Sequence, residues 1–338
     1  MKNQGVTIRE VAEYAQVSTA TVSRVLNGDP RVIDLTRAKV LDAIEKLDYK
    51  VNSVARSLKT NKTRTIGIMA PDLAGDYFMY IAESMDKELA NHGYSLVVCV
   101  SHDSPEEEAK RLRHLAERLV DGIVVIPATS KGKHFGFLKE LNIPFVFVDR
   151  TVNDIEADSV LVDNEEGAFE ATKALINDGY TRIGYVGGLQ DISIFRERFQ
   201  GYKRAMESST LTVEDDFVRF FPPTLPFGYR AMEEMMHRPE SPDAWFIANA
   251  FMHIGATNYV ISEAGERASR IVFAAFDEMP YSPLLVHCRY AVQQPIAEMG
   301  KTAARLILKR IDQVDAEESY QPQQLRLKTR LITHKPHA

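Results

Sequence analysis

Four side chains near the N-terminus carry groups that can contact the edges of nucleic acid bases. They are Thr19, Ala20, Ser23 and Arg24. A guanidinium can donate two hydrogen bonds to O6 and N7 of guanine, and an alanine methyl can contact the methyl group of thymine. At this spacing the four side chains share one side of a helix. We therefore expect a helix whose first residues can lie against base edges in the major groove of duplex DNA.

A short helix is predicted immediately before it. Thr7 and Glu10 have the spacing of a capping box, in which each side chain accepts from the other residue's backbone N–H. Apolar residues then recur at helical spacing at Ile8, Val11, Ala12 and Ala15. Ser18 is expected to cap the second helix, which runs from Thr19 to about Leu26 and ends in the run 27–30.

A third helix is predicted from about Thr36 to Leu47. Its inward stripe would contain Val40, Leu41, Ile44 and Leu47. Two short helices joined by a tight turn and braced by a third form a helix-turn-helix unit, which is typical of proteins that bind duplex DNA. The alternative is a small helical subdomain without a nucleic acid partner, and the helical pattern alone leaves both open.

The hydrophobic pattern changes after Thr65. Continuous apolar runs typical of buried strands follow at 66–70, 96–100, 122–126, 145–148, 182–187, 245–248 and 271–275. Helical stretches separate them, at 78–92, 105–120, 135–141, 167–179, 195–208, 227–237, 253–265 and 297–311. The alternation predicts parallel doubly wound α/β sheets in two lobes, with a cleft outside the carboxyl ends of the strands.

Polar and aromatic side chains follow two of these runs. Asp72, Tyr77 and Phe78 come after the first run, and Asp149 and Arg150 come directly after the fourth. Carboxylates can accept hydrogen bonds from sugar hydroxyls, and an aromatic ring can cover the apolar face of a sugar. The alternatives are that Asp149 only caps a turn and that Phe78 belongs to the core.

Charge is distributed unevenly along the 338 residues. Up to Thr65 there are 12 Lys and Arg against 7 Asp and Glu, whereas the remainder has 29 against 40. A basic head on an acidic body suits a protein whose head alone meets a polyanion, although chance clustering would give the same counts. With 45% hydrophobic and 26% charged residues, the composition excludes a disordered or fibrous chain.

Several other classes of protein lack their motifs here. Cys99 and Cys288 are isolated, which predicts buried thiols and neither a disulfide nor a metal site. The sequence has no GxGxxG after a strand, P-loop, GxSxG or HExxH motif, so we expect neither an enzyme nor a cofactor. No apolar run approaches about 18 residues and Met1–Gly5 is polar, so we expect a cytoplasmic, nucleoid-associated protein without a membrane span.

Two segments closely resemble the lactose/purine repressor (LacI/GalR) family of transcription regulators. They are the run from Val6 to Asn27 and the run Tyr49-Lys-Val-Asn-Ser-Val-Ala-Arg-Ser-Leu58. The resemblance implies an all-α helix-turn-helix head at 1–50, a hinge helix at 51–63 and a body at 64–338 that binds an effector and dimerises. The body would have a two-lobed periplasmic-binding-protein-like fold, with an N-lobe at about 64–163 plus 294–322 and a C-lobe at about 164–292 plus 323–338.

In that family a leucine of the hinge helix enters the minor groove, and Leu58 matches it. An apolar wedge unstacks a base step, and the bent DNA then contacts more protein. Lysine and arginine side chains beside it would bind phosphates without reading sequence. The DNA-binding residues that we expect are Thr7, Ser18, Thr19, Ala20, Thr21, Ser23, Arg24, Asn27, Asn52, Ala55, Arg56, Leu58 and Lys59.

The same resemblance assigns effector-binding residues to the body. The run 194–202 resembles the family's Arg-x-x-Gly-aromatic motif and carries over Arg198, and the run 248–255 resembles its Asn-Asp-x-x-Ala-x-Gly motif and carries over Asn249. The pair Phe276-Asp277 and the segment 293–295 match two further family segments. The complete predicted set is Asp72, Phe78, Asp149, Arg196, Arg198, Phe221, Asn249, Asp277 and Gln294.

Two positions depart from the family pattern. Ala250 stands where many members have Asp, and Gln293 replaces a frequent Arg. The run 191–198 resembles the fructose/sucrose repressors, which respond to phosphorylated sugars, and Arg196 and Arg150 would there help to hold a phosphate. The resemblance therefore implies a small sugar or a sugar phosphate as effector.

Together these features predict a homodimeric repressor that binds a pseudo-palindromic operator in double-stranded DNA under effector control. One alternative is a cytoplasmic sugar-binding receptor without a DNA role, against which the basic head argues. Another is a regulator that uses a phosphoprotein corepressor.

Overall fold

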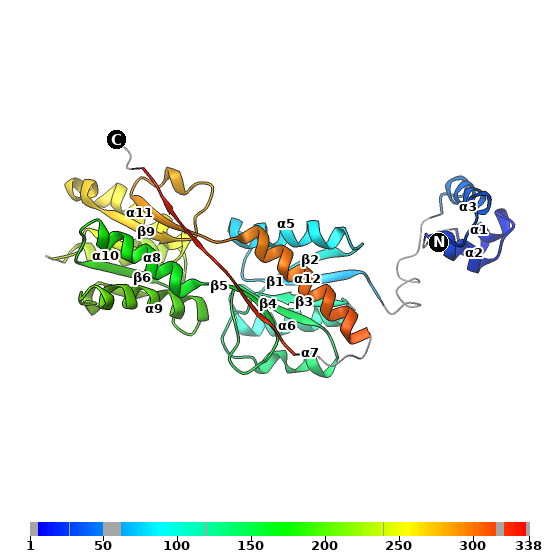
Figure 1. Ribbon diagram of the computed structural model, residues 1–338, viewed down its shortest axis with the longest axis horizontal. Coiled ribbons are helices and arrows are strands. Elements are labelled where there is room, and N and C mark those ends of the chain that lie inside the picture. Colours follow the sequence, from blue (N-terminus) through cyan, green and yellow to red (C-terminus); the bar gives the residue numbers. More distant parts are fainter. Residues whose placement is uncertain are drawn as a thin grey trace, which may run out of the picture. The chain divides into compact units, whose positions relative to one another are not determined.

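The computed structural model describes residues 6–26, 28–49, 62–118, 120–238, 240–315 and 321–335. The chain divides into two compact units, Met1–Thr63 and Arg64–Ala338, which we call the head and the body (Figure 1). Most of the predicted hinge helix, residues 51–61, lies outside the described residues. That helix therefore stays a prediction.

The head contains helices α1 (Ile8–Tyr14), α2 (Thr19–Leu26) and α3 (Asp34–Lys46). The predicted capping box is present: the Glu10 N–H donates to Thr7 Oγ1 over 3.4 Å, and the Thr7 N–H donates to Glu10 Oε2 over 2.6 Å. Val11, Val22 and Val40, one from each helix, are completely buried where the helices meet. The helix-turn-helix prediction is thus confirmed, with α2 at the predicted residues.

Leu41 does not lie on the inward stripe that the sequence predicted for the third helix. Its side chain is 52% exposed, whereas Val40 and Ala43 are completely buried. Residues three and four apart share a helix face, so the stripe that begins at Val40 continues to Ala43 and Ile44. Leu41 lies one position off that stripe, and the prediction for it was wrong.

The described residues of the body form two sheets of six strands each. The first sheet has the order β11-β5-β4-β3-β1-β2 and is entirely parallel. Its strands are β1 (Thr65–Ala70), β2 (Ser95–Val100), β3 (Gly122–Val125), β4 (Phe145–Val148), β5 (Asp158–Val162) and β11 (Gln324–Leu327). The predicted parallel α/β architecture of this lobe is confirmed.

The second sheet repeats the same arrangement. Its order is β12-β10-β9-β8-β6-β7, and every pairing is parallel except that of β12 with β10. Its strands are β6 (Ile183–Gly187), β7 (Val218–Phe220), β8 (Ala244–Ile247), β9 (Val272–Phe276), β10 (Cys288–Gln293) and β12 (Arg330–Thr333). Each strand of one sheet therefore has a counterpart in the other, and β4 corresponds to β9.

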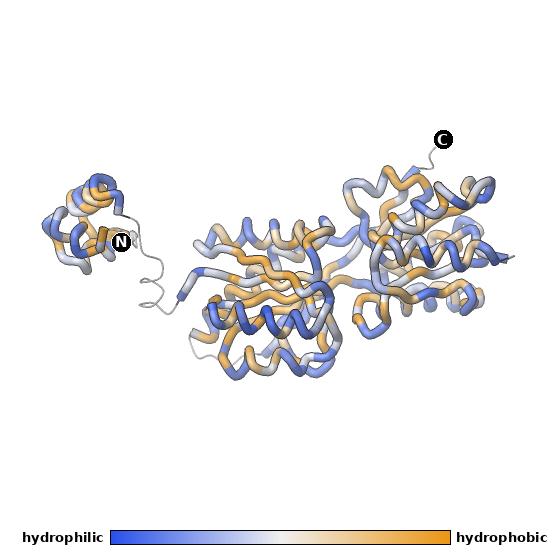
Figure 2. The backbone as a smooth tube through the Cα atoms, turned by 180° about the vertical axis from the view of Figure 1, so that it is seen from behind, coloured by the Kyte–Doolittle hydropathy of each residue, from blue (hydrophilic) through white to orange (hydrophobic). Residues whose placement is uncertain are grey.

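Helices cover both faces of each sheet. In the first lobe they are α5 (Asp76–Ala90), α6 (Pro105–Glu117), α7 (Gly136–Glu140) and α12 (Ile296–Asp315); in the second they are α8 (Asn164–Asn177), α9 (Ser193–Ser208), α10 (Leu225–Met236) and α11 (Ala250–Glu263). Short 3-10 helices lie at Lys133–Phe135, Asp215–Phe217, Gly265–Arg270 and Ser282–Leu284. Figure 2 shows the strands as the most hydrophobic part of each lobe.

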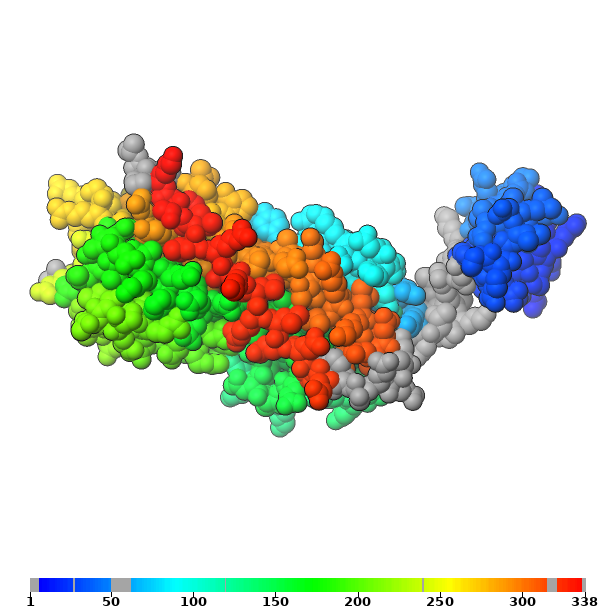
Figure 3. Space-filling model, viewed as in Figure 1, coloured from blue at the N-terminus to red at the C-terminus, as the bar shows by residue number. Residues whose placement is uncertain are grey.

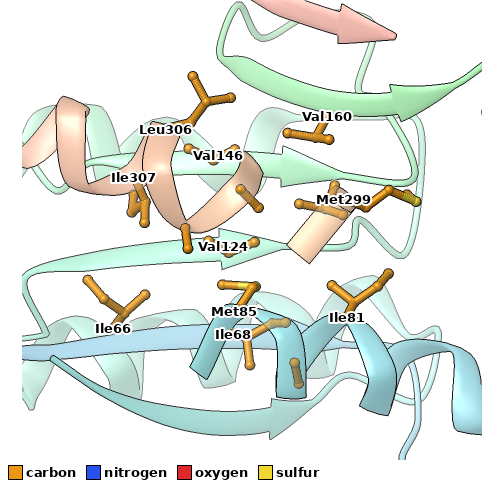
Figure 4. Packing of buried hydrophobic residues seen from close by; sticks show 14 of the residues in the cluster. Ile66, Ile68, Ile81, Met85, Val124, Val146, Val160, Met299, Leu306 and Ile307 are labelled. Carbon is orange, nitrogen blue, oxygen red and sulfur yellow. The ribbon is translucent and has the colours of Figure 1, made fainter. Parts of the chain in front are cut away.

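The core of the first lobe shows how this covering works. Ile81 and Met85 of α5 and Met299 and Ile307 of α12 are completely buried and point toward the β-sheet (Figure 4). Complete burial of such a side chain stabilises the fold by about 1.5–3 kcal/mol. Leu112 and Leu138 lie in the separate cluster on the opposite face of the same sheet.

Within the part of the body that the structure describes, the chain crosses between the lobes at three places: from β5 to α8, from β10 to α12, and from β11 to β12. Figures 1 and 3 show the last crossing as the red C-terminal segment that runs over both lobes. The sequence prediction gave all of 323–338 to the C-lobe, which is wrong for β11. Leu325 and Leu327 pack on the core of the first lobe while β11 pairs with β5, and this alternating edge strand has no continuous apolar run to reveal it.

Candidate effector cleft and DNA-binding face

A cavity of about 70 Å³ lies between the two lobes of the body. Typical ligand sites have roughly 300–1,000 Å³, so little free space remains between the lining side chains. Seven of the nine residues predicted to bind an effector line it: Asp72, Phe78, Asp149, Arg198, Asn249, Asp277 and Gln294. The structure thus brings together side chains that are more than 200 residues apart in the sequence.

Asp149 and Asp277 take equivalent positions in the two lobes. Asp149 directly follows β4 and Asp277 directly follows β9. Both have a positive φ, 67° and 76°, a conformation that Asp and Asn tolerate better than most residues. The chain therefore turns sharply at the end of each strand, and both carboxylates are buried at the cavity.

A chain of hydrogen bonds joins these two aspartates across the cleft. The Tyr77 hydroxyl lies 2.8 Å from Asp149 Oδ1 and 2.8 Å from Gln294 Oε1. Gln294 Nε2 in turn donates to Asp277 Oδ1 over 2.6 Å. Both lobes and the second crossing segment are therefore connected through four polar side chains.

The hydroxyl of Tyr77 has one hydrogen for two acceptors. The Gln294 amide does not supply another, because its Oε1 faces Tyr77 while its Nε2 donates to Asp277. Burial raises the pKa of Asp149, although the nearby Arg150 and Arg198 oppose this effect. Burial also raises the pKa of Tyr77 well above its usual value, with a further contribution from the charge of Asp149. A proton on Asp149 would satisfy both acceptors.

Arg198 lies on α9 and is 1% exposed. Its Nε donates to Asn164 Oδ1 over 2.9 Å, and its Nη1 donates to the Ala248 carbonyl over 2.7 Å. Its Nη2 is 3.7 Å from Asp277 Oδ1, and the guanidinium lies 3.7 Å from the ring centroid of Phe276. Four different neighbours therefore fix the orientation of this cation.

Gly201 allows α9 to bring Arg198 to this position. A Cβ atom at residue 201 would collide with the backbone oxygen of Glu165 on α8. The glycine of the Arg-x-x-Gly motif thus permits the close packing of α9 on α8. The arginine of the motif, one turn earlier, lines the cavity.

Arg150, on the facing lobe, is 4% exposed. Its Nη1 donates to Asp103 Oδ1 over 2.6 Å and to the Pro127 carbonyl over 3.1 Å. Its Nε lies 3.8 Å from Asp149 Oδ2. The guanidinium is therefore held between two aspartates.

Two predicted effector residues do not line the cavity. Arg196 points elsewhere on α9, and its Nη1 donates to the Gln190 carbonyl over 3.2 Å. Phe221 stacks on Phe227, with 5.3 Å between ring centroids and 13° between planes. Because α9 turns by about 100° per residue, Arg196 and Arg198 cannot face the same cavity.

The sequence prediction missed several lining residues. Phe251 and Tyr281 add two rings, Asp103 adds a carboxylate, and Met279 adds an apolar contact. Phe251 is the second residue of α11, two positions after Asn249, so its place beside a predicted residue was a usable signal. Tyr281 lies in a loop and had no such signal.

The two lobes also touch each other directly beside the cavity. The Ser130 hydroxyl of the first lobe donates to the Asp191 carbonyl of the second, and the Thr151 N–H donates to Ser193 Oγ over 3.1 Å. The ring of Phe251 lies close to Gly75, where a Cβ would approach it to 2.9 Å. These contacts and the small cavity describe a closed cleft.

The candidate DNA-binding face lies on α2. Thr19, Ala20 and Arg24 are exposed there, and Thr21 and Ser23 are half-buried. Val22 and Val25 anchor the opposite side of the helix in the core. Ser18 Oγ accepts from the Thr21 N–H over 3.1 Å and lies 2.9 Å from the Thr21 hydroxyl, so Ser18 caps the N-terminus of α2.

Six of the predicted DNA-binding residues are not among those that the structure describes: Asn27, Asn52, Ala55, Arg56, Leu58 and Lys59. Thr7, like Ser18, is exposed and acts as a helix cap. The exposed N-terminal half of α2 is therefore the part of the predicted interface whose geometry is defined.

Comparison with known proteins identifies the class of both units. Residues 63–335 match the family of periplasmic binding proteins and sugar binding domain of LacI family, and residues 7–52 match bacterial regulatory proteins of the lacI family. The chain belongs to the LacI family and is a DNA-binding transcriptional regulator with a sugar-binding-type body.

Individual relatives agree with this assignment. Catabolite control protein A of Priestia megaterium is 31% identical, over 93% of this chain and 95% of its own. The transcriptional repressor PurR of Aliivibrio salmonicida is 31% identical, over 97% of this chain and 99% of its own. The transcriptional regulator CelR in complex with cellobiose has a TM-score of 0.72 and 28% identity, over 97% of this chain and 98% of its own.

A solved Lac repressor dimer bound to operator and the anti-inducer ONPF shares the fold. Its TM-score is 0.83 at 22% identity, over 98% of each chain. Among the described residues, no helix is long and apolar enough to cross a membrane, and no group of three His, Cys, Asp or Glu side chains is placed to hold a metal ion.

Proposed function

We propose that this protein is a homodimeric repressor whose operator binding is controlled by a small sugar in the cleft between the lobes. The observation that supports this most strongly is the hydrogen-bonded chain from Asp149 through Tyr77 and Gln294 to Asp277. A ligand that enters the cavity must replace bonds of this chain. It thereby changes the free energy of the closed cleft relative to an open one.

A shift between the closed and open cleft rotates the lobes about the three crossing segments, and this rotation would carry the effect of the ligand to the head. A ligand shifts an equilibrium only by the difference between its affinities for the two states. Since the ligand contacts both lobes, that difference is large when the lobes rotate about the three crossings. The coupling is reciprocal, so operator DNA must change effector affinity by the same factor.

Exposed apolar residues on the body suggest where a second copy binds. On the first lobe, Met79 and Tyr80 of α5 are exposed, and Val97 and Val98 are 38% and 36% exposed on β2, the edge strand beside α5. On the second lobe, Ile261 is 65% exposed and Leu284 is 77% exposed. Apolar surface of this kind favours association, and a two-fold pair of heads fits a pseudo-palindromic operator.

A DNA-bound regulator acts where the DNA is, so the proposal places the protein in the cytoplasm at the nucleoid. The proposal also assigns ligand binding, and no catalysis, to the cleft. Relatives named as a transcriptional repressor and a transcriptional regulator support this choice.

The full-length protein tests the proposal in a fluorescence anisotropy titration. Promoter fragments and shuffled duplexes of equal length are compared at physiological salt, with and without sugars. We expect at least one fragment to bind about 10³-fold more tightly than its shuffled control, and a sugar to change that ratio. Equal affinity for all duplexes under every condition would refute the proposal.

A further inference from the structure

A chain of three polar side chains leads from Arg198 to the edge strand β11. Asn164, the first residue of α8, is 1% exposed, and its Oδ1 accepts from Arg198 Nε over 2.9 Å. Its Nδ2 donates to Glu197 Oε2 over 3.1 Å. Glu197 in turn accepts two hydrogen bonds from Arg326, over 2.9 and 3.3 Å. We call Asn164, Glu197 and Arg326 the relay, and its contact with the cavity passes through Arg198, which lines it.

The relay connects the two lobes. Glu197 lies on α9 of the second lobe, whereas Arg326 lies on β11, the edge strand of the first sheet. Arg326 also donates to the Val162 carbonyl at the end of β5, over 3.4 Å. The first and third crossings meet here, because the Asp163 N–H donates to the Leu327 carbonyl over 3.1 Å. The ion pair of the relay therefore lies where two crossing segments are joined.

The amide of Asn164 has a donor end and an acceptor end, and only one of its orientations suits both neighbours. With Oδ1 toward Arg198, a donor meets an acceptor at each end. The reverse orientation would place the amide nitrogen against a guanidinium N–H and the amide oxygen against a carboxylate. Glu197 therefore decides which end of the amide faces Arg198. Arg326 fixes the plane of the Glu197 carboxylate through two hydrogen bonds.

We propose that Glu197 and Arg326 are positioning residues for the cleft, because they orient the amide that holds Arg198 at the cavity. Since Arg326 adjoins the third crossing, rotation of the lobes about the crossings changes its pair with Glu197 and thereby the orientation of Arg198. This part in regulation rests on the proposed function. The positioning of Arg198 depends only on the contacts of the relay.

The consequence for the cleft follows from the bonds of Arg198. Two direct hydrogen bonds to its guanidinium are present among the described residues, from Nε to Asn164 and from Nη1 to the Ala248 carbonyl. Loss of the first leaves the group free to turn about the second. Nη2, now 3.7 Å from Asp277 Oδ1, would then leave its place beside that carboxylate.

The Nε–H of Arg198 reports the relay directly. In full-length protein that contains isotope-labelled arginine, NMR resolves side-chain Nε–H groups, and Arg198→Lys identifies the signal of Arg198 by its loss. Glu197→Ala should speed hydrogen exchange of this group by at least about tenfold, because Asn164 loses the partner that orients it. The backbone N–H of Arg198, inside α9, is the internal reference, since local unfolding of the helix would accelerate both groups.

Conservative variants separate positioning from a loss of stability. Glu197→Gln keeps an oxygen for Asn164, so exchange should stay within about threefold of wild type. Arg326→Gln should accelerate exchange by at least about threefold, although two side chains separate it from Arg198, and Arg326→Lys, which keeps the charge, should restore part of the protection. The matched control is Glu207→Ala, which removes an exposed carboxylate near the end of α9 and should have no effect.

Equal exchange of the Arg198 Nε–H in Glu197→Ala and Glu207→Ala would overturn the inference. An acceleration that Glu197→Gln shares in full, or that the backbone N–H of Arg198 matches, would overturn it as well. The measurement uses neither DNA nor a sugar. A protein that shows the expected exchange rates but binds no duplex specifically would therefore contradict the proposed function and leave the positioning role in place.

Discussion

Asp149 and Asp277 mirror each other across the cleft: each directly follows the third strand of its sheet order, and each has a left-handed backbone, with φ of 67° and 76°. Their surroundings nevertheless differ. Asp149 competes with Gln294 for the single hydrogen of Tyr77. Asp277 accepts from both Gln294 Nε2 and the Ala250 N–H, over 2.6 and 3.3 Å. Their neutral variants should therefore change stability in opposite directions.

Asp149→Asn is expected to raise the free energy of unfolding at pH 7 by about 1 kcal/mol. The amide brings a donor for the Tyr77 oxygen and removes a buried charge, and asparagine tolerates the positive φ. Denaturant unfolding at pH 7 measures this change. A loss of stability would show that the Asp149 carboxylate is better satisfied than its hydrogen bonds indicate.

The effect of Asp149→Asn should depend on pH. Burial raises the pKa of Asp149, so the folded chain holds this proton more readily than the unfolded chain. The contribution of wild-type Asp149 to stability is then greatest below its unfolded pKa and falls as pH rises through the folded pKa. The stability difference between variant and wild type should shrink when unfolding is measured at mildly acidic pH, and a difference that grows there would contradict the assignment.

Asp277→Asn should lower the free energy of unfolding by about 1–3 kcal/mol. The variant turns one acceptor into a donor, which opposes the Gln294 amide or the Ala250 N–H, and it removes the carboxylate 3.7 Å from Arg198. The same unfolding assay, run beside Asp149→Asn, checks the sign. Equal effects of the two substitutions would mean that the two ends of the cleft are electrostatically alike.

Gly201→Ala should destabilise the body by about 1–3 kcal/mol, because the new Cβ meets the Glu165 backbone and pushes α9 from α8. The matched control is Gly136→Ala on α7, where no atom beyond the chain neighbours and the helix's own backbone lies within 4 Å of the new Cβ. That substitution should be neutral or stabilising by about 0.5–1 kcal/mol, since alanine loses less entropy in a helix. Thermal unfolding distinguishes the two, and similar losses would argue against the role of Gly201 in the close packing of α9 on α8.

Arg24→Ala should cost about 1–3 kcal/mol of discrimination between operator and mutated operator. Arg24 is exposed on α2, whereas Val25 beside it holds the helix. The control is Glu45→Ala on the exposed surface of α3, outside the predicted DNA-binding set, which should leave base preference unchanged. Anisotropy titrations against single-base operator variants measure both. An unchanged base preference in Arg24→Ala would move base reading to other residues.

Val97→Glu should weaken the homodimer, because it buries a charge if β2 forms the contact. Light scattering over a dilution series would show more monomer than in wild type, and operator affinity would fall with it. Leu141→Glu at the end of α7, where Leu141 is 59% exposed, is the control that should leave the dimer unchanged. A wild-type dimerisation constant in Val97→Glu would exclude β2 from the interface.

The sequence predicted those parts of the fold that have a local signal. Capping chemistry at Thr7 and an apolar stripe revealed α1 and α2, and continuous apolar runs revealed strands such as β1 and β4. The edge strand β11 was assigned to the wrong lobe, since its Gln-Leu-Arg-Leu pattern is defined only by pairing with the distant β5. The local hydrophobic pattern of a strand cannot identify a pairing strand that is more than 150 residues away in the sequence.

The same distinction holds for the cleft. Asp72 and Asp149 were predicted because they follow strands, and Arg198 and Asn249 because their motifs resemble a family. Arg196 was also predicted from the sequence, but it does not line the cavity, since the helix turns it away from Arg198. The engagement of Arg150 by Asp103 depends on a loop conformation, so the charge of the cavity could only be read from the structure.

The third crossing of the chain also constrains synthesis. The first lobe lacks α12 until residue 315 and its strand β11 until residue 327 have been made, although its other strands are complete by residue 162. On the ribosome, the first lobe must therefore wait, with the apolar face that α12 will cover still open, while nearly all of the second lobe is translated. Contacts of such long sequence separation are slow to form, so this lobe should be the one that needs chaperone protection during translation.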